Sequence, residues 1–218
     1  MPEYAWLEVK VWGEYACFTR PEMKAERVSY SVMTPSAARG LLEAIFWKPE
    51  IAWQVREIWV LNPIRHFSIL RNEVNSKAPP CTARGWFQTR GSYFAEEDRA
   101  QRHTLGLRDV AYIIKADVVL VPHAMAEDVA KYRDQFRRRV QRGQCYHQPY
   151  LGCREFVAAF GPPNGTEQPI HVTDTLGRML FDLDYASDNT GRGRPRFFQA
   201  QLEHGILRIP PEVCVKEK

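Results

Sequence analysis

Along residues 1–160, stretches in which apolar residues recur at every second position alternate with stretches in which they recur every three or four residues. The order of these stretches restricts the fold more than any other feature of this chain. Between Ala5 and Trp12, Leu7, Val9 and Val11 occupy every second position, which is the period of a strand with one buried face. Similar patterns predict strands at 52–61, 66–71, 109–121 and 150–160, and helices at 34–47 and 126–140. This order of strands and helices predicts an α+β fold with a ferredoxin-like (RRM-like) antiparallel sheet and two helices on one face.

The two helices carry their own start and stop signals. Thr34 is a suitable N-cap, and Pro35 suits the first helical turn that follows it. Gly143 can terminate the second helix. The second helix has an apolar stripe at intervals of three and four residues, formed by Val129, Tyr132, Phe136 and Val140.

Composition breaks suggest how the chain is divided. Residues 74–107 are polar and punctuated by Gly and Pro, which predicts a long loop or a small inserted element that orders when RNA binds. The GPPNG segment at 161–165 is the candidate boundary between two domains. We therefore expect a ferredoxin-like domain over 1–160, and a C-terminal β-hairpin appendage over 161–218 in which the strands are joined by SDNTGRGRP.

Several classes of protein are excluded by what the sequence lacks. No apolar run has the length of a membrane span, and no signal peptide is recognisable, so we expect a cytoplasmic protein with no membrane partner. The five cysteines form no CxxC pair and the six histidines no HxH or HExxH pattern, so we expect reduced, mostly buried thiols and no metal. No Walker, GxSxG or GxGxxG motif occurs, so no cofactor is expected.

Positive charge is concentrated rather than general, because the formal net charge is only +4. The stretch from Lys131 to Phe156 contains seven Lys or Arg residues against Asp134 and Glu155. A solvated helix face is the ordinary explanation of a charge run, but here few acids are available for local pairing, which favours binding to several nucleic-acid phosphates. The aromatic residues Trp6, Trp12, Tyr15 and Phe18 are candidate stacking rings for single-stranded RNA, or else core residues.

Three separated blocks resemble a known family. They are GEYACFTRPEMKAERVSYSVMTPSAARGLLEAIFWKP, the RNE at 71–73 and RRRVQRGQCYHQPYLGCREF, and together they resemble the CRISPR-associated Cas-five family of subtype I-C, in the RAMP superfamily. The resemblance implies a metal-independent endoribonuclease that cuts the repeat of CRISPR precursor RNA by 2′-OH attack, leaving 2′,3′-cyclic phosphate and 5′-OH ends. It also implies that the protein stays on the 5′ handle of the CRISPR RNA, beside the backbone and large subunits of a Cascade-type complex.

The same resemblance indicates the catalytic positions. The family's Tyr before WKP and its Lys-His pair correspond here to Phe46, Lys131 and Tyr132. Lys131 would act as a cation beside the phosphorane, or as a base if neighbouring arginines lowered its pKa. Tyr132 is either an acid/base group or a core ring, and His147 either replaces the missing imidazole or is an ordinary loop histidine.

Phosphate contacts are expected from cations on both sides of the first helix and along the second. The candidate RNA-binding residues are Arg20, Lys24, Arg27, Arg39, Lys48, Arg133, Arg137, Arg138, Arg139, Arg142 and Arg154. Two alternatives remain open at this point. One is a non-catalytic subunit that only binds the handle, and the other is a protein that binds or cleaves double-stranded DNA through the same cations.

Overall fold

One mostly antiparallel sheet, in which the short strand β2 pairs with β5 in parallel, runs through the computed structural model. The structure describes residues 4–23, 25–76, 80–92, 94–185 and 193–214. The strands are β1 (Leu7–Ala16), β2 (Arg27–Val28), β3 (Ile51–Val60), β4 (His66–Val74), β5 (Arg99–Leu120), β6 (Ala159–Gly161), β7 (Asp174–Tyr185), β8 (Gly193–Glu203) and β9 (Ile206–Arg208). The helices are α1 (Pro35–Ile45), α2 (Pro80–Thr89), α3 (Val129–Arg142) and α4 (Pro211–Cys214), with short 3-10 turns η1 (Ala95–Asp98) and η2 (Pro122–Ala124).

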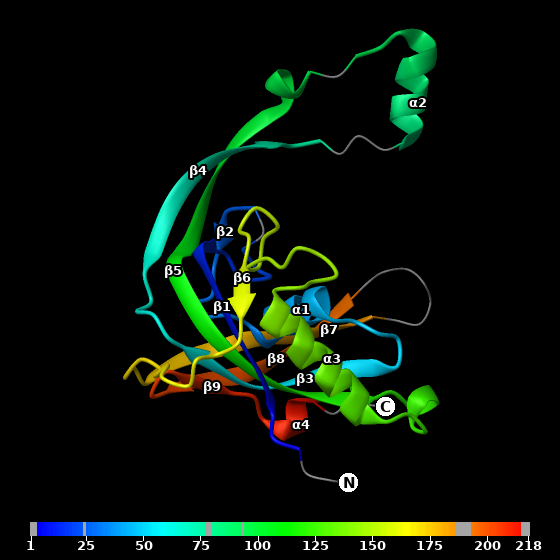
Figure 1. Cartoon of the computed structure of the whole chain (residues 1–218). Coiled ribbons are helices and arrows are strands. Elements are labelled where there is room, and N and C mark those ends of the chain that lie inside the picture. Colours follow the sequence, from blue (N-terminus) through cyan, green and yellow to red (C-terminus); the bar gives the residue numbers. More distant parts are fainter. Residues whose placement is uncertain (1–3, 24, 77–79, 93, 186–192, 215–218) are drawn as a thin grey trace.

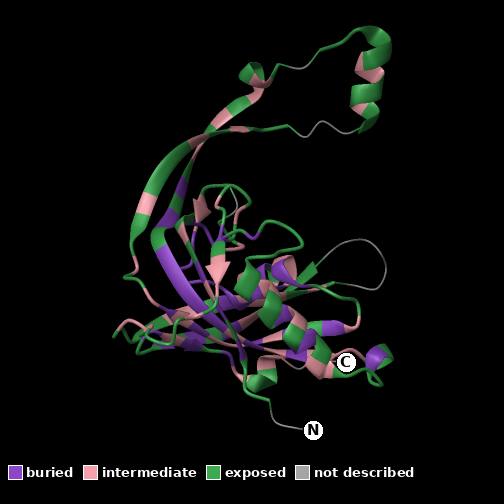
Figure 2. Ribbon diagram, in the orientation of Figure 1, coloured by how far each residue is buried: buried purple, intermediate pink, exposed green. Residues whose placement is uncertain are grey.

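The ferredoxin-like core predicted from the sequence is confirmed. Strands β6, β1, β5 and β3 lie side by side in that order, all antiparallel, which is the arrangement expected for a βαββαβ unit. Figure 1 shows α1 and α3 over one face of these strands. The core lies between the helices and that face, where Val9, Val11 and Ile114 are fully buried (Figure 2).

Two forms were expected for the segment 74–107, a long loop or a small inserted element, and the structure has an inserted element that includes helix α2 and the extended ends of two strands. Strand β5 begins at Arg99, ten residues before the predicted start, and pairs with β4 from Leu107↔His66 out to Arg99↔Val74. The two strands form a ribbon that extends away from the body, with α2 at its far end (Figure 1). Alternate residues of β5 in this ribbon are half-buried or buried, but they include Arg102, Thr104 and Gly106, so the buried face is not apolar and the sequence did not indicate a strand.

Three predicted boundaries were also wrong, each for a local reason. Strand β1 does not end at Gly13 but continues to Ala16, because the glycine leaves room for Leu151, whose Cδ1 would lie 2.5 Å from an added Cβ. Helix α3 starts at Val129 rather than 126, where the Asp128 carboxylate accepts from the Ala130 N–H. Residues 150–158 form an irregular segment that bonds to the end of β1 (Cys17 N to Leu151 O, 3.0 Å), and only β6 pairs as a strand.

The C-terminal strands form the expected hairpins and join the same sheet. Strands β7 and β8 pair along their length, and β9 pairs with both β8 and β3. The predicted linker 187–195 lies largely outside the described residues. The division into two domains stays a prediction, and β9 and one shared core cluster are what connect 161–218 to the rest. No helix within the described ranges is long and apolar enough to cross a bilayer.

Candidate active site and nucleic-acid interface

The C-terminal end of α1 brings together the positions that the resemblance singled out. Phe46 is the C-cap of α1, where the backbone turns extended (φ −149°, ψ 114°), and its ring is fully buried. Its carbonyl accepts from Trp53 Nε1 at 3.0 Å, which holds this end of the helix against β3. The Phe46 ring centroid lies 6.5 Å from that of Tyr132, so two positions 86 residues apart are neighbours in the fold.

Lys131 lies beside this pair at the start of α3. Its side chain is exposed, forms an ion pair with Glu127 one turn earlier, and lies with Nζ 4.8 Å from the Tyr132 ring centroid. The hydrogen bond to Glu127 raises the pKa of Lys131, and a hydrogen bond to the Tyr132 side chain acts in the same direction. The lysine is therefore a cation at neutral pH, and the alternative in which arginines lower its pKa to make it a base is wrong.

Tyr132 belongs to the core as well as to this cluster. Its side chain is only 4% exposed and lies on the predicted apolar stripe, with Phe136 and Val140 buried beside it. Lys131 Nζ lies 4.8 Å from the Tyr132 ring centroid, so the tyrosine meets the lysine at the edge of the core. The structure thus accommodates both interpretations of this tyrosine, a core ring with a hydroxyl at the candidate site.

His147 reaches the same end of α1 from the segment after α3. Its backbone N–H donates to Ala44 O at 3.0 Å, and the Tyr146 N–H donates to the same carbonyl at 2.8 Å. The imidazole is exposed and meets the Tyr146 ring edge to face, at 4.2 Å between centroids. The fold therefore ties the His147 backbone to Ala44, two residues before Phe46, at a carbonyl near the end of the helix that has no partner within the helix.

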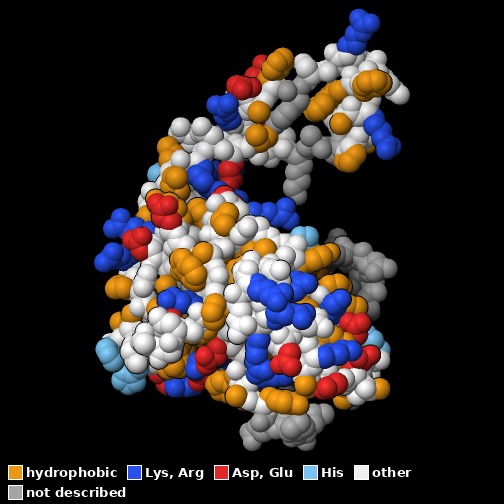
Figure 3. Space-filling view, in the orientation of Figure 1, with side chains coloured by type: hydrophobic (Ala, Val, Ile, Leu, Met, Phe, Trp, Pro, Cys, Tyr) orange, Lys and Arg blue, Asp and Glu red, His pale blue; other side chains and the backbone are white. Residues whose placement is uncertain are grey.

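Four of the predicted phosphate-binding cations are exposed and unengaged. Within the described residues, no hydrogen bond or ion pair involves the side chains of Lys48, Arg138, Arg142 and Arg154. Lys48 follows the end of α1, and two of the arginines lie on α3. Figure 3 shows Lys and Arg side chains gathered over this helix. Unpaired cations lose little on meeting an anion, so these side chains are free to contact a phosphate.

The other described candidates already have partners. Arg39 donates to both carboxylate oxygens of Asp182 at 2.8 Å and also to Glu43, which raises its pKa despite partial burial. Arg139 donates to Ile45 O at 2.9 Å and covers the Phe46 ring. The remaining contacts are Arg20 with Glu22 and the Tyr30 ring, Arg27 with Glu73 and Glu155, and Arg137 with Asp134. Lys24 lies outside the described residues.

Arg133 differs most from the expected exposed array. It is only 2% exposed, its Nη2 donates to Ala5 O, and its Nη1 lies 3.6 Å from Asp117 Oδ1. Burial lowers the pKa of this guanidinium. The signal was present in the sequence, because position 133 follows Val129 by four residues and so falls within the width of the apolar stripe.

Two features of the surface were not visible in the sequence. Acidic residues distant along the chain hold the base of the ribbon, where Glu155 accepts from Arg27 at 3.2 Å and from Arg71 at 2.7 Å. Of the four candidate stacking rings, Phe18 is buried, whereas Trp6, Trp12 and Tyr15 are about two-fifths exposed. Phe18 is therefore a core ring, while the other three present ring surface to solvent.

Comparisons with known proteins agree with these observations. The sequence model of a family described as CRISPR-associated protein (Cas_Cas5) matches residues 6–210. A protein of Thermus thermophilus named CRISPR pre-crRNA endoribonuclease Cas5d is 49% identical over 223 residues, covering 94% of this chain and 92% of the relative. A protein of the same name from Mannheimia succiniciproducens is 42% identical over 218 residues, covering 94% and 95%.

Solved structures share the fold. A functionally uncharacterized protein from Streptococcus mutans superposes with a TM-score of 0.67 at 20% identity, covering 95% of this chain and 93% of that one. A CRISPR-associated protein gives 0.67 at 22% identity, covering 95% of each. A chain of a CRISPR RNA-guided surveillance complex gives 0.53 at 13% identity, covering 96% and 92%.

Proposed function

This chain belongs to the CRISPR-associated Cas5 family, and from that premise we propose that it is an endoribonuclease that cuts CRISPR precursor RNA within the repeat. The observation that carries the proposal is the convergence of Lys131, Tyr132 and Phe46 at the end of α1, beside the exposed cations of α3. The relatives named for this activity are 42–49% identical over most of the chain.

The reaction we propose needs no metal and is an attack by the RNA on itself. The 2′-oxygen forms a bond to the adjacent phosphorus, and the bond from phosphorus to the 5′-oxygen breaks, which gives a 2′,3′-cyclic phosphate and a 5′-OH. A proton leaves the 2′-OH and another reaches the 5′-oxygen. Lys131, held as a cation by Glu127, would stabilise the charge that develops on the phosphorane oxygens.

The proton transfers need a group that the family position 46 does not supply, since Phe46 has no hydroxyl. His147 is the better placed candidate for the base, because it is exposed and is fixed at the same helix end by its backbone. Tyr132 is the candidate for the other proton, through the hydroxyl that meets Lys131. After cleavage, Lys48, Arg138, Arg142 and Arg154 would keep the chain on the 5′ handle within a Cascade-type complex.

The test is cleavage of a labelled cognate repeat RNA in EDTA, with the RNA ends identified. Lys131→Ala should lower the single-turnover rate about 100-fold or more, while Lys131→Arg, which keeps the charge, should retain most of it. Loss of rate in Tyr132→Phe or His147→Ala would name the group that moves a proton. Cleavage that requires added Mg²⁺, or that leaves 3′-OH ends, would contradict this mechanism.

A second candidate function is a subunit that binds the handle without cutting it. The absent hydroxyl at Phe46 and the burial of Tyr132 favour this reading. Tight binding of the repeat with no cleavage by the wild type would establish it. Competition of that binding by duplex DNA at physiological salt would identify DNA as a further ligand.

A further inference from the structure

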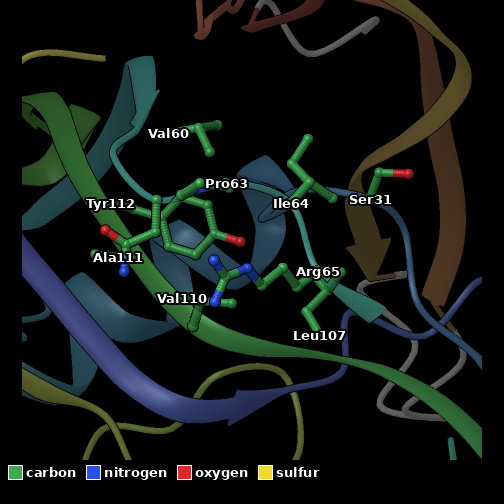
Figure 4. A pocket seen from close by; sticks show the side chains of 10 residues that line it. Ser31, Val60, Pro63, Ile64, Arg65, Leu107, Val110, Ala111 and Tyr112 are labelled. Atoms are coloured by element: carbon green, nitrogen blue, oxygen red, sulfur yellow. The ribbon is translucent and has the colours of Figure 1, made fainter. Parts of the chain in front are cut away.

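A second site lies next to Lys131, in a cavity of about 690 Å³ between the N-terminal segment, the end of β5 and the start of α3. Its lining includes Tyr4, Trp6, Arg56, Asp117, Glu127 and Arg133. The pocket in Figure 4, between the β3–β4 connection and β5, holds only about 10 Å³, the space of one water molecule. The larger cavity can accept a nucleotide, whereas the smaller one cannot.

The lining contains a buried donor without a partner. Arg133 Nε is fully buried and has no hydrogen-bond acceptor within the described residues, although the other two nitrogens of the guanidinium contact Ala5 O and Asp117. A buried unsatisfied N–H destabilises the folded protein, so its retention suggests a use. Arg133 also lines the cavity, so a ligand bound there would lie beside this guanidinium group.

The charges of the lining decide which part of an RNA fits. Two guanidinium groups, Arg56 and Arg133, face three carboxylates, Asp117, Glu127 and Asp128. A phosphate would gain little there, since the carboxylates outnumber the guanidinium groups. A neutral base that offers acceptors to an arginine and N–H groups to a carboxylate suits the lining better. Guanine has this combination, with O6 and N7 on one edge and N1–H and N2–H₂ on another.

Aromatic surface for stacking is available at the mouth. Tyr4 is 40% exposed and Trp6 is 45% exposed, and both contribute to the lining. The guanidinium of Arg133 lies 5.0 Å from the Tyr4 ring centroid, so ring and cation form one wall. A base that enters would stack on these rings beside the Arg133 guanidinium group.

The cavity is connected to the candidate active site through Glu127, which lines it and also pairs with Lys131. We propose that it binds a guanine base of the repeat RNA next to the phosphate that is cut, and so selects the cleavage position. This inference rests on the proposed function, and it assigns the positioning role to Trp6 and Arg133.

The experiment uses the full chain and repeat RNAs that carry one 6-thioguanosine at each guanosine near the cut in turn. Ultraviolet crosslinking followed by peptide mapping should place one of these guanosines on the segment containing Tyr4 and Trp6. In cleavage assays, inosine or 7-deazaguanosine at that same position should raise KM about 10-fold, since each removes one of the recognised atoms. Trp6→Ala should raise KM similarly for the unmodified RNA and should reduce its sensitivity to the analogues.

Tyr185→Ala is the control, because Tyr185 is an aromatic side chain that is 63% exposed and does not line the cavity. If crosslinks map elsewhere, or if Trp6→Ala behaves like Tyr185→Ala while the RNA is still cut, the base-binding site is wrong and the proposed function stands. If a 4-thiouridine crosslinks to the cavity as well as 6-thioguanosine, the groove does not select a base and the inference fails. If the wild type neither binds nor cuts the repeat, both proposals fall.

Discussion

At the scale of single residues, Cys153 has an environment unlike that of an ordinary thiol. It is half-buried, a hydrogen bond from Cys17 lowers its pKa to about 6, and Arg27 Nη1 lies 3.4 Å from its sulfur. The expectation that the cysteines are mostly buried holds for Cys17 and is wrong for Cys81 and Cys145, which are exposed. The lowered pKa and the partial exposure of Cys153 predict a thiol that ionises more readily than a free cysteine, in a position that small reagents reach.

This charge state can be measured by alkylation. The rate at which iodoacetamide modifies Cys153, followed by peptide mass, should rise with pH through a half-maximum near 6 and level off above it. Cys17→Ala removes the donor and should move the half-maximum upward, while Cys17→Ser keeps a donor and should move it less. A wild-type profile that is still rising above pH 8 would contradict the assignment.

Sequence reasoning reached the candidate site only in part at this scale. The resemblance indicated Phe46, Lys131 and Tyr132, and the fold places these three positions together. The partners of the cations could not be predicted, because Asp182 and Asp117 are distant in sequence from the arginines they bind. The pair of Lys131 with Glu127 is an exception, because a spacing of four residues near the start of a helix predicts an ion pair.

At the scale of elements, two glycines with positive φ differ in what a side chain would meet: at one only the backbone conformation opposes it, and at the other it would also clash with a neighbour. Gly143 ends α3 at φ +62° with nothing within 4 Å of an added Cβ. Gly152 has φ +86°, and its added Cβ would lie 2.1 Å from Cys17 O. We expect Gly143→Ala to lower the free energy of unfolding by about 1–2 kcal/mol, the cost of a left-handed alanine, and Gly152→Ala to cost clearly more.

Urea denaturation of the two variants and the wild type checks this difference. Equal midpoints for both variants would mean that the segment 150–158 shifts away from Cys17 at little cost. The bond between Cys17 N and Leu151 O makes such a shift unfavourable, because moving the segment also breaks that contact.

Elements with one buried face were predictable, and the others were not. Strands β1 and β3 and helix α1 follow their apolar periods because each packs against the core. The outer half of β5 and helix α2 are largely solvent-exposed, so their sequences carry no period that a core imposes. The segment 150–158 is apolar for another reason, since Leu151 and Ala158 are buried although the backbone between them is irregular.

At the scale of the whole molecule, the basic residues that the sequence could not distinguish form two groups, those held in ion pairs and those without a partner among the described residues. The double variant Arg138→Gln/Arg142→Gln removes two unengaged charges and should lower the slope of log K against log salt for repeat RNA by about 2. Arg39→Gln should instead destabilise the fold and leave that slope unchanged, because Arg39 is held by Asp182. Filter binding over a salt series measures the slope.

Arg137→Gln is the control on the same helix, since Arg137 already pairs with Asp134 and should change the slope by clearly less than half of the change in the double variant. A change in Arg137→Gln equal to half that of the double variant would show that the ion pairs of α3 open when RNA binds. An unchanged slope in the double variant would remove α3 from the interface.

Strand β5 belongs both to the central sheet and to the ribbon, as one uninterrupted strand of 22 residues. Deleting one residue within 99–107 would therefore put the pairing with β4 out of step with the pairing to β1, and a one-residue step exchanges the two faces of a strand. Among the described residues between Val74 and Arg99, no pairing with the central sheet fixes such a register. Within the ribbon, a change of length or an inserted module is therefore tolerated at the far end, which makes that end the part of the ribbon most open to evolutionary and engineered variation.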